Sequence, residues 1–410
     1  MAGRLDVFLP TPLTGRGPSY TCGMIARALA SAELSVTVTT PHARGYSITP
    51  ARIREVLPRW ARYLPYRWIR SGTDAHFEAA FLSYVTQAEA SPHGAYIWPD
   101  CTLNTVTELQ RAGLKVFREM VNCHRGTAKL ILDDAYQRLG LPPSHGIDNA
   151  SVDAEQELLE TVDSVFCPNS CVETSLLQNG LKSERLLPAS YGWDPKRFSG
   201  TNTLLPPHAG VTVVFVGSIC VRKGAHLLLD YWEKSKVCGR LVLAGAMEQA
   251  LRERCASLLA HDNVTVLDYV SDVGALYRSA DVFAFPSLEE GGPQVTYEAA
   301  GCGLPAITTP MGAGRMTRHH REGYVLDPYD QASWIVALQT LAENTSRRLE
   351  MACAAKARAE FFHWDAVAAR RRRQILNCLF GIARQATDDR PSFDELGYGF
   401  DDLEISPLAC

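Results

Sequence analysis

Two glutamates flank a sharp turn in the stretch EEGGPQVTYE, which covers residues 289 to 298. The two glycines of this turn can adopt backbone angles that other residues avoid, and the proline after them suits the first position of a helix. We therefore predict a helix from 293 to about 302, with Glu290 just before it and Glu298 about one and a half turns inside it. The adjacent Glu289 is predicted to be a solvent-facing charge.

This arrangement suits a ligand that carries both phosphate and hydroxyl groups. Unpaired N–H groups and the dipole at a helix N-terminus favour an anion. A carboxylate only accepts hydrogen bonds and can accept two at once, as from the vicinal diol of a ribose or a sugar. The residues that would cradle the anion are Gly291, Gly292, Pro293, Gln294 and Val295.

A second turn, in VGSICVRKGAHLLL from 216 to 229, carries adjacent cations. Arg222 and Lys223 precede Gly224, which we predict to open a helix. Two cations at a helix N-terminus favour a phosphate, and for this turn alone a solvated surface pair is an equal alternative. Cations for a diphosphate, combined with carboxylates for hydroxyls, describe a pocket for a nucleotide-sugar.

Short runs rich in Val, Ile, Leu and Phe alternate with amphipathic stretches of helix length in both halves of the chain. This alternation predicts an α/β protein with two Rossmann-like, doubly wound parallel-sheet domains that face a central cleft at the carboxyl ends of their strands. The predicted strands are 4–10, 34–40, 95–100, 115–121 and 164–170 in the first half, and 211–218, 240–245, 264–270, 282–287, 305–309 and 324–328 in the second.

The predicted boundaries follow from a break in this alternation, where a segment is rich in Pro, Gly and polar residues. The predicted parts are a first domain at 1–193, a linker at 194–210, a second domain at 211–365, a C-terminal helix at 366–385 that packs back on the first domain, and an acidic tail at 386–410.

The composition excludes several classes of protein. A chain of 410 residues exceeds what one hydrophobic core usually serves, and a net charge of -4 gives no support to nucleic-acid binding. No apolar run approaches the ~20 residues that span a bilayer, and no signal-peptide layout is present. The scattered cysteines suit reduced thiols, so we expect a cytoplasmic protein. At the closest pair, Cys167 and Cys171, buried thiols are favoured over a zinc site.

The stretch EEGGPQVTYEAAGCGLPAITTP resembles the motif of two glutamates separated by seven residues in retaining glycosyltransferases of the family 4 type. The resemblance covers most of residues 4 to 380 and implies the GT-B architecture, with an acceptor-side first domain and a donor-binding second domain. It implies transfer of a sugar, from a UDP- or GDP-sugar by preference, to a hydroxyl acceptor such as a glycan, a lipid-linked glycan or a small metabolite. Further matching stretches are YVLDPYD, FFHWDAVAARRRRQIL, PLTGRGPSYTCGMIARALA, DSVFCPNSCVETSLLQNGL and PASYGWDPKRF.

The resemblance also implies roles for the residues of the two turns. Glu298 would hold the ribose hydroxyls, Glu290 would face the transferred sugar, and Lys223 would neutralise the diphosphate beside the backbone N–H groups of residues 291–295. Gly15 and Gly17 would let a loop of the first domain approach the donor and the acceptor.

One further position matches the family pattern and another departs from it. His124, in MVNCHRG, matches a histidine that reaches the reacting sugar in relatives, with a hydrogen-bonded structural histidine as the alternative. Many relatives carry an arginine where this chain has Ser218. We expect Arg222, four residues further on, to supply that charge at the donor.

The chain contains no Asp-x-Asp, the motif by which another transferase architecture holds a divalent metal on the diphosphate. We therefore predict metal-independent catalysis without a cofactor, in which Lys223, Arg222 and the helix end supply the positive charge. The alternatives are a catalytically inactive nucleotide-sugar-binding scaffold of the same fold and a nucleotide-sugar epimerase. PMGAGRMT, from 310 to 317, departs from a dinucleotide fingerprint at its third small residue, which disfavours an oxidoreductase. The adjacent His319 and His320 would point apart on a helix, which favours a solvated surface over a metal site.

The segment 51–70 carries six arginines and one glutamate with interleaved Trp and Tyr residues. Such a segment could rest on an anionic membrane as a peripheral contact, and a partly buried acceptor-side loop explains the aromatic residues equally well. The tail at 386–410 contains seven acidic residues and one arginine, and is predicted to be a mobile extension. Composition leaves the oligomeric state open.

Overall fold

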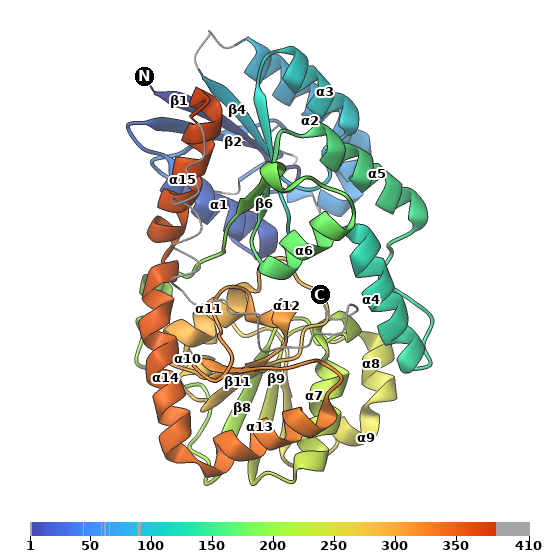
Figure 1. The fold of residues 1–410 in the computed structure, drawn as a ribbon, viewed down its shortest axis with the longest axis vertical. Coiled ribbons are helices and arrows are strands. Elements are labelled where there is room, and N and C mark those ends of the chain that lie inside the picture. The colour runs from blue at the N-terminus through green and yellow to red at the C-terminus, as the bar shows by residue number, and fades with distance from the viewer. Residues whose placement is uncertain are drawn as a thin grey trace.

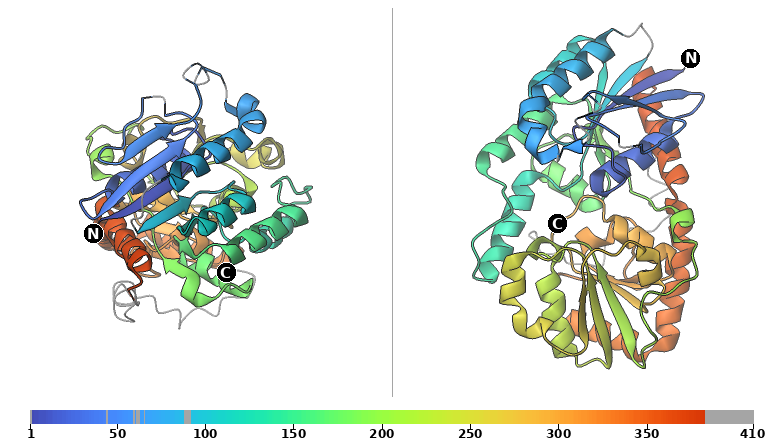
Figure 2. Two further views of the ribbon diagram at one scale, coloured as in Figure 1. Left: turned by 90° about the horizontal axis from the view of Figure 1, so that it is seen from above. Right: turned by 180° about the vertical axis from the view of Figure 1, so that it is seen from behind.

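The computed structural model describes residues 2–43, 45–58, 60, 63–64, 66–87 and 92–382. They form two α/β units that face each other, each built on a parallel sheet (Figure 1). The view from behind in Figure 2 shows the first unit above and the second below, with the red α15 rising along the first. The predicted fold class of two facing parallel-sheet domains is confirmed.

The first sheet has seven strands in the order β3-β2-β1-β4-β5-β6-β7, all paired in parallel. The strands are β1 Gly3–Phe8, β2 Leu34–Thr40, β3 Arg52–Glu55, β4 His93–Ile97, β5 Lys115–Glu119, β6 Ser164–Cys167 and β7 Leu186–Pro188. The helices of this unit are α1 Gly17–Leu29, α2 Tyr66–Thr86, α3 Leu103–Arg111, α4 Arg125–Arg138, α5 Asn149–Thr161 and α6 Ser170–Gln178, and a 3-10 turn, η2, covers Ser183–Arg185.

The second sheet has six parallel strands in the order β10-β9-β8-β11-β12-β13. The strands are β8 Val211–Val216, β9 Gly239–Ala244, β10 Val264–Leu267, β11 Val282–Phe285, β12 Ala306–Thr308 and β13 Gly323–Val325. The helices are α7 Ala225–Ser235, α8 Gln249–Arg254, α9 Ala256–Leu259, α10 Val273–Tyr277, α11 Gln294–Gly301, α12 Pro310–Ala313, α13 Gln331–Glu343, α14 Thr345–Ala359 and α15 Trp364–Phe380, and the 3-10 turns are η3 Pro195–Phe198, η4 Val221–Lys223 and η5 Glu360–Phe362.

All the predicted strands are present, and most of them lie inside the sheets, where both faces are covered; β10 and β13 lie at the edges of the second sheet. Every residue of β8 is buried, as a continuous apolar run predicts for a central parallel strand. Most strands end a few residues earlier than predicted, as β6 does at Cys167. Two strands were missed, β3 and β7, and both lie at sheet edges. The sequence of β3, RIRE, is too polar, and β7 too short, to be recognised as a strand.

The chain crosses between the two units at residues 189–210 and again near η5. After the second crossing, α15 packs against α1 of the first unit (Figure 1). Its Arg371 donates from Nη1 to Glu119 Oε2 at 2.7 Å and to Tyr96 Oη at 2.8 Å. This buried pair joins α15, the last described helix, to β5. A helix that follows the second domain in the chain therefore packs as part of the first domain.

The segment 51–70 and the tail at 386–410 were both predicted to lie at the surface. Part of 51–70 is β3, which pairs with β2 in the first sheet, and α2 begins within the segment at Tyr66. Trp60 and Tyr63 are 64% and 75% exposed, and the membrane contact stays a prediction. Among the described residues, no helix combines the length and the apolar character needed to cross a membrane. The predicted tail at 386–410 lies outside the described residues.

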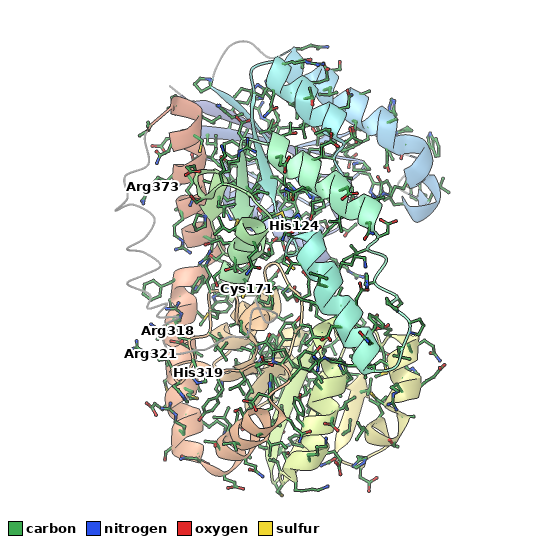
Figure 3. The ribbon with its side chains drawn as sticks, turned by 45° about the vertical axis from the view of Figure 1, so that its right-hand side comes forward. His124, Cys171, Arg318, His319, Arg321 and Arg373 are labelled. Carbon is green, nitrogen blue, oxygen red and sulfur yellow. The ribbon has the colours of Figure 1, made fainter. Side chains whose placement is uncertain are left out.

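The adjacent histidines do not lie on a helix, which corrects one part of the prediction, and His320 is exposed. His319 and His320 follow the short helix α12 in a loop before β13, and their ring centroids are 3.8 Å apart. The backbone folds back here, with His320 at φ 62°, so the rings lie together. His319 Nδ1 accepts a hydrogen bond from the N–H of Val325 at 3.1 Å (Figure 3 labels His319). This histidine therefore fixes a local turn.

Candidate functional site

The cationic turn after β8 lies directly against the turn after β11. Gly224 allows this contact, since its φ of 66° is left-handed and a Cβ there would lie 2.0 Å from the carbonyl oxygen of Pro286. The N–H of Leu288 donates to the carbonyl of Arg222 at 2.9 Å, which ties the two turns together. The two motifs that the sequence singled out are thus adjacent in space.

Lys223 and Glu290 form an ion pair at this junction. Both are nearly buried, with 8% and 7% of their surfaces exposed. Burial lowers the pKa of Lys223 well below its usual range, and repulsion from Arg222 acts in the same direction. A cation in such a site gains strongly from an anionic neighbour, which here is the carboxylate of Glu290.

Glu289 is not the solvent-facing charge that the sequence suggested. It is 1% exposed and bonds to the first domain, accepting from Asn122 Nδ2 at 2.6 Å and from the N–H of Cys123 at 3.0 Å. Arg222 Nη1 lies 3.3 Å from the same carboxylate. The prediction is wrong because the partners of Glu289 in the first domain lie more than 160 residues away in the chain. No local signal distinguishes Glu289 from an exposed loop glutamate.

The helix of the opening motif, α11, begins at Gln294, with Pro293 as its N-cap and not its first helical residue. The first N–H groups of a helix have no intrahelical partner, so this end can donate to an anion as predicted. The glycines before it meet the first domain closely. A Cβ on Gly291 would lie 2.3 Å from the backbone of Val121, and one on Gly292 would lie 2.2 Å from the ring of Tyr191.

Glu298 lies inside α11 with 5% of its surface exposed. It accepts from Gln294 Nε2 at 2.9 Å, and Arg197 Nη1 lies 3.5 Å away. Burial raises the pKa of Glu298 from 4.5 to about 7, and both Arg197 and the Gln294 bond oppose this shift. Arg197 was missed because its segment, DPKRF, was assigned to the linker and not to a site.

The glycine loop of the first domain adjoins the same helix. Gly15 and Gly17 have φ values of 69° and 53°, and α1 begins at Gly17. Four residues on, Thr21 Oγ1 donates to Gln294 Oε1 at 3.0 Å. A hollow of about 540 Å³ lies beside the loop and is lined by Thr14, Arg16, Ala43, Gly45 and Tyr46. The loop is therefore close to the helix that carries Glu298.

His124 is held by bonds within the first domain. It is the N-cap of α4, where Nδ1 accepts from the N–H of Gly126 at 3.1 Å, and Nε2 lies 2.9 Å from Gln156 Oε1. Because Nδ1 accepts, Nε2 carries the proton and donates to the amide oxygen. Burial lowers the pKa of the His124 ring. Figure 3 shows it at the upper end of α4. This geometry favours the structural alternative in the structure as it stands.

His124→Asn separates the two roles of this residue. Asparagine is a good N-cap, whereas alanine at this position should cost about 1 kcal/mol of the free energy of unfolding. We expect His124→Asn to keep the stability that His124→Ala loses, as measured by denaturant unfolding. Sugar transfer by His124→Asn at the wild-type rate would establish a structural role, and a stable but inactive variant would establish contact with the sugar.

A cavity of about 720 Å³ opens between the two domains at the carboxyl ends of both sheets. Ser218 and Arg222 line it from the second domain together with Glu289, while Lys223, Glu290 and Glu298 lie outside its lining. Residues of both domains contribute, namely Pro99, Arg118, Glu119, Met120, Val121, Asn122, Cys123, Arg125, Ala128, Leu132, Tyr136, Ser144, His145, Gly146, Ile147, Glu155, Ser218, Cys220, Arg222, Ala246, Met247, Glu248 and Glu289. The cavity holds charges of both signs, and Arg222 projects its charge there beside Ser218.

Cys167 and Cys171 are both buried, in β6 and α6, with 0% and 1% of their surfaces exposed. Within the described part of the chain, no group of three or more His, Cys, Asp or Glu side chains is arranged to hold a metal ion.

Residues 210–344 match the model of a protein family described as glycosyl transferases group 1. The second domain is therefore similar to the group 1 glycosyl transferases over these residues. The match runs from β8 to α13 and so includes both turns described above. For residues 210–344, the match supports the resemblance to glycosyltransferases that was found in the sequence.

Curated relatives match over part of their length. The D-inositol 3-phosphate glycosyltransferase of Pseudarthrobacter chlorophenolicus is 35% identical over 130 residues, which is 31% of each chain. The protein of the same name from Xylanimonas cellulosilytica is 31% identical over 189 residues, 44% of this chain and 43% of the relative. The chain thus spans less than half of the length of these relatives.

Solved structures match the fold over nearly the whole chain. Sucrose-phosphate synthase from Thermosynechococcus elongatus has a TM-score of 0.71 at 19% identity, covering 93% of this chain and 100% of that one. The HepE protein of Anabaena, in complex with UDP and glucose, has a TM-score of 0.65 at 14% identity and covers 92% and 100%. At these identities the likeness concerns the fold, which is the GT-B arrangement around the group 1 domain.

Proposed function

We propose that this protein is a retaining, metal-independent glycosyltransferase that moves a sugar from a nucleotide-sugar to a hydroxyl acceptor. The observation that carries the proposal is the junction of the two turns. Lys223 pairs with Glu290 there, α11 begins four residues after Glu290, and Glu298 lies inside that helix, all within the range that matches the family model. A UDP- or GDP-sugar is the favoured donor. The HepE structure contains UDP and glucose, which supports UDP.

The chemistry assigned to the site follows the charges of the reaction. The bond between the anomeric carbon and the diphosphate oxygen breaks, a bond to the acceptor oxygen forms, and the acceptor hydroxyl gives its proton to the departing diphosphate. Negative charge therefore develops on the diphosphate, where Lys223, Arg222 and the N–H groups of α11 stabilise it without a metal. Glu290 faces the sugar, and Glu298 accepts the ribose hydroxyls. Retention rests on the family resemblance alone.

The acceptor is assigned to the interdomain cavity, because that space adjoins the proposed diphosphate site through Arg222 and is lined largely by the first domain. Its mixed lining suits a polar, hydroxyl-rich molecule such as a glycan, a lipid-linked glycan or a small metabolite. Arg118 pairs with Glu155 at 3.1 Å, and Arg125 lies 3.5 Å from the same carboxylate. Two cations share one carboxylate here, and the net positive charge that remains disfavours a cationic acceptor group beside them.

Nucleotide binding tests the proposal without knowledge of the acceptor. A ligand that binds only the folded state stabilises it and so raises the melting temperature. The stabilisation is about 2.7 kcal/mol at a ligand concentration 100 times the dissociation constant. We expect UDP or GDP to raise the melting temperature in a thermal-shift assay, with ADP as the comparison. No shift with any of the three nucleotides would contradict the proposal. A shift without donor turnover for any acceptor would favour the inactive scaffold.

A further inference from the structure

Two carboxylates of the second domain bridge the cleft on either side of η4. We name Glu248 and Glu289 the bridging carboxylates. Glu248 follows β9 and Glu289 follows β11, and both line the interdomain cavity. Each accepts hydrogen bonds from the first domain and also from η4, the turn that ends in Lys223.

Glu248 contacts two side chains of the first domain. Tyr136 Oη in α4 donates to Glu248 Oε1 at 2.7 Å, and Ser144 Oγ lies 3.1 Å from the same oxygen. The other carboxylate oxygen accepts from the N–H of Val221 at 3.1 Å. Figure 1 shows the lower end of α4 reaching down beside α8 of the second domain. One rigid carboxylate thus joins α4 to the first residue of η4.

Glu289 makes the equivalent connection from the other side. Its oxygens accept from Asn122 Nδ2 and from the N–H of Cys123 in the first domain, at 2.6 and 3.0 Å. Arg222 Nη1, in the middle of η4, lies 3.2 Å from its carbonyl oxygen and 3.3 Å from its carboxylate. A 3-10 turn of three residues has few internal bonds of its own. Its position therefore depends on these outside partners.

We propose that the bridging carboxylates are positioning residues, which couple contact with the first domain to the placement of η4 and so of Lys223. When α4 and the loop at Asn122 are in contact with them, each carboxylate is fixed and holds η4 against the start of α11. Without that contact, each side chain regains rotamer freedom and its bond to η4 weakens. This assignment rests on the proposed function only where it gives Lys223 a role in catalysis.

Hydrogen exchange measures the coupling without any donor. Tyr136→Phe removes the bond from Tyr136 Oη to Glu248 and the 2.8 Å bond that Ser144 Oγ donates to the same hydroxyl, and it changes no residue of the second domain. We expect the amides of residues 219–224, read by mass spectrometry, to exchange roughly 2- to 10-fold faster in this variant, the range of one net hydrogen bond. Tyr136→Phe/Ser144→Ala, which removes both donors, should enlarge the effect.

The matched control is Tyr231→Phe. Tyr231 is buried to a similar extent, and its hydroxyl donates to the carbonyl of Pro328 at 2.8 Å within the second domain. This control should leave exchange at 219–224 unchanged. A thermal melt verifies that wild type, Tyr136→Phe and Tyr231→Phe are each folded. Equal exchange at these residues in the three folded proteins would overturn the proposal.

Kinetics distinguish this proposal from the proposed function. With UDP-glucose and GDP-mannose as probes, Tyr136→Phe should lower kcat for nucleotide release about 2- to 10-fold and change KM little, since Lys223 acts on charge that develops during the reaction. Faster exchange in a protein that binds no nucleotide would support the coupling and contradict the glycosyltransferase. Faster exchange with an unchanged kcat would remove the positioning role.

Discussion

Lys223→Ala should lower turnover of the nucleotide-sugar by about 10²- to 10³-fold, the usual effect of removing a fixed group aimed at developing charge. Lys223 is the cation that the fold brings to the start of α11, and it is buried against Glu290. Nucleotide affinity should fall less than turnover, because the diphosphate gains negative charge only as the glycosidic bond breaks. Release of nucleotide from UDP- and GDP-sugars measures both quantities.

The same substitution has a structural consequence that must be separated from catalysis. Removal of Lys223 leaves the buried carboxylate of Glu290 with Arg222 Nη1, 3.9 Å away, as its remaining cationic neighbour. Breaking a typical buried pair costs about 3 to 5 kcal/mol of stability, and we expect a smaller loss here because Arg222 compensates part of the charge. Lys223→Ala/Glu290→Gln removes the remaining carboxylate charge and should recover stability without recovering turnover. Lys234→Ala, on the exposed face of α7, is the matched control and should behave as wild type. Wild-type turnover by Lys223→Ala would remove this residue from the site.

Glu298→Gln should weaken nucleotide binding by about 10- to 100-fold, because a hydrogen bond to a charged group contributes roughly 1.5 to 3 kcal/mol. The pKa of about 7 adds a pH dependence to this result. The carboxylate form accepts the ribose hydroxyls, so wild-type affinity should rise with pH up to about 7 and then level off. The glutamine variant should lack that slope. Calorimetric titration with UDP from pH 5.5 to 8 measures both proteins under the same conditions.

The sign of the stability effect follows from the same shift. A carboxyl whose pKa is raised by folding holds its proton more tightly in the folded protein, so its ionisation costs stability as pH rises from 4.5 to about 7. Glu298→Gln should therefore flatten the fall in the free energy of unfolding across that window.

In the affinity titrations, the phosphate groups of UDP titrate in the same way with both proteins, so their contribution cancels in the comparison. Equal affinities and equal slopes for the two proteins would refute the ribose role.

The sequence was sufficient where structure depends on local pattern. Runs such as VTVVFV predict central parallel strands because both faces of such a strand are buried, and the turn before Gly224 was predicted from residue types alone. The edge strand β3 was missed, because one side of an edge strand faces solvent and tolerates a polar sequence such as RIRE.

The rest of the site depends on contacts between distant parts of the chain. Glu289 was taken for a surface charge, and its partners Asn122 and Cys123 belong to the other domain. Arg197, in the predicted linker, lies beside Glu298 only because the chain returns there between the sheets. Pairing decides whether a charged side chain is buried, and a single sequence contains no record of pairs brought together by folding.

Nucleotide release from a panel of UDP- and GDP-sugars by wild type, Lys223→Ala and Lys234→Ala, measured side by side, tests glycosyl transfer at the Lys223 site most directly. We expect release by wild type and Lys234→Ala from at least one donor, and a loss of about 10²-fold or more in Lys223→Ala. Release from no donor by wild type, or equal release by all three proteins, would contradict this expectation.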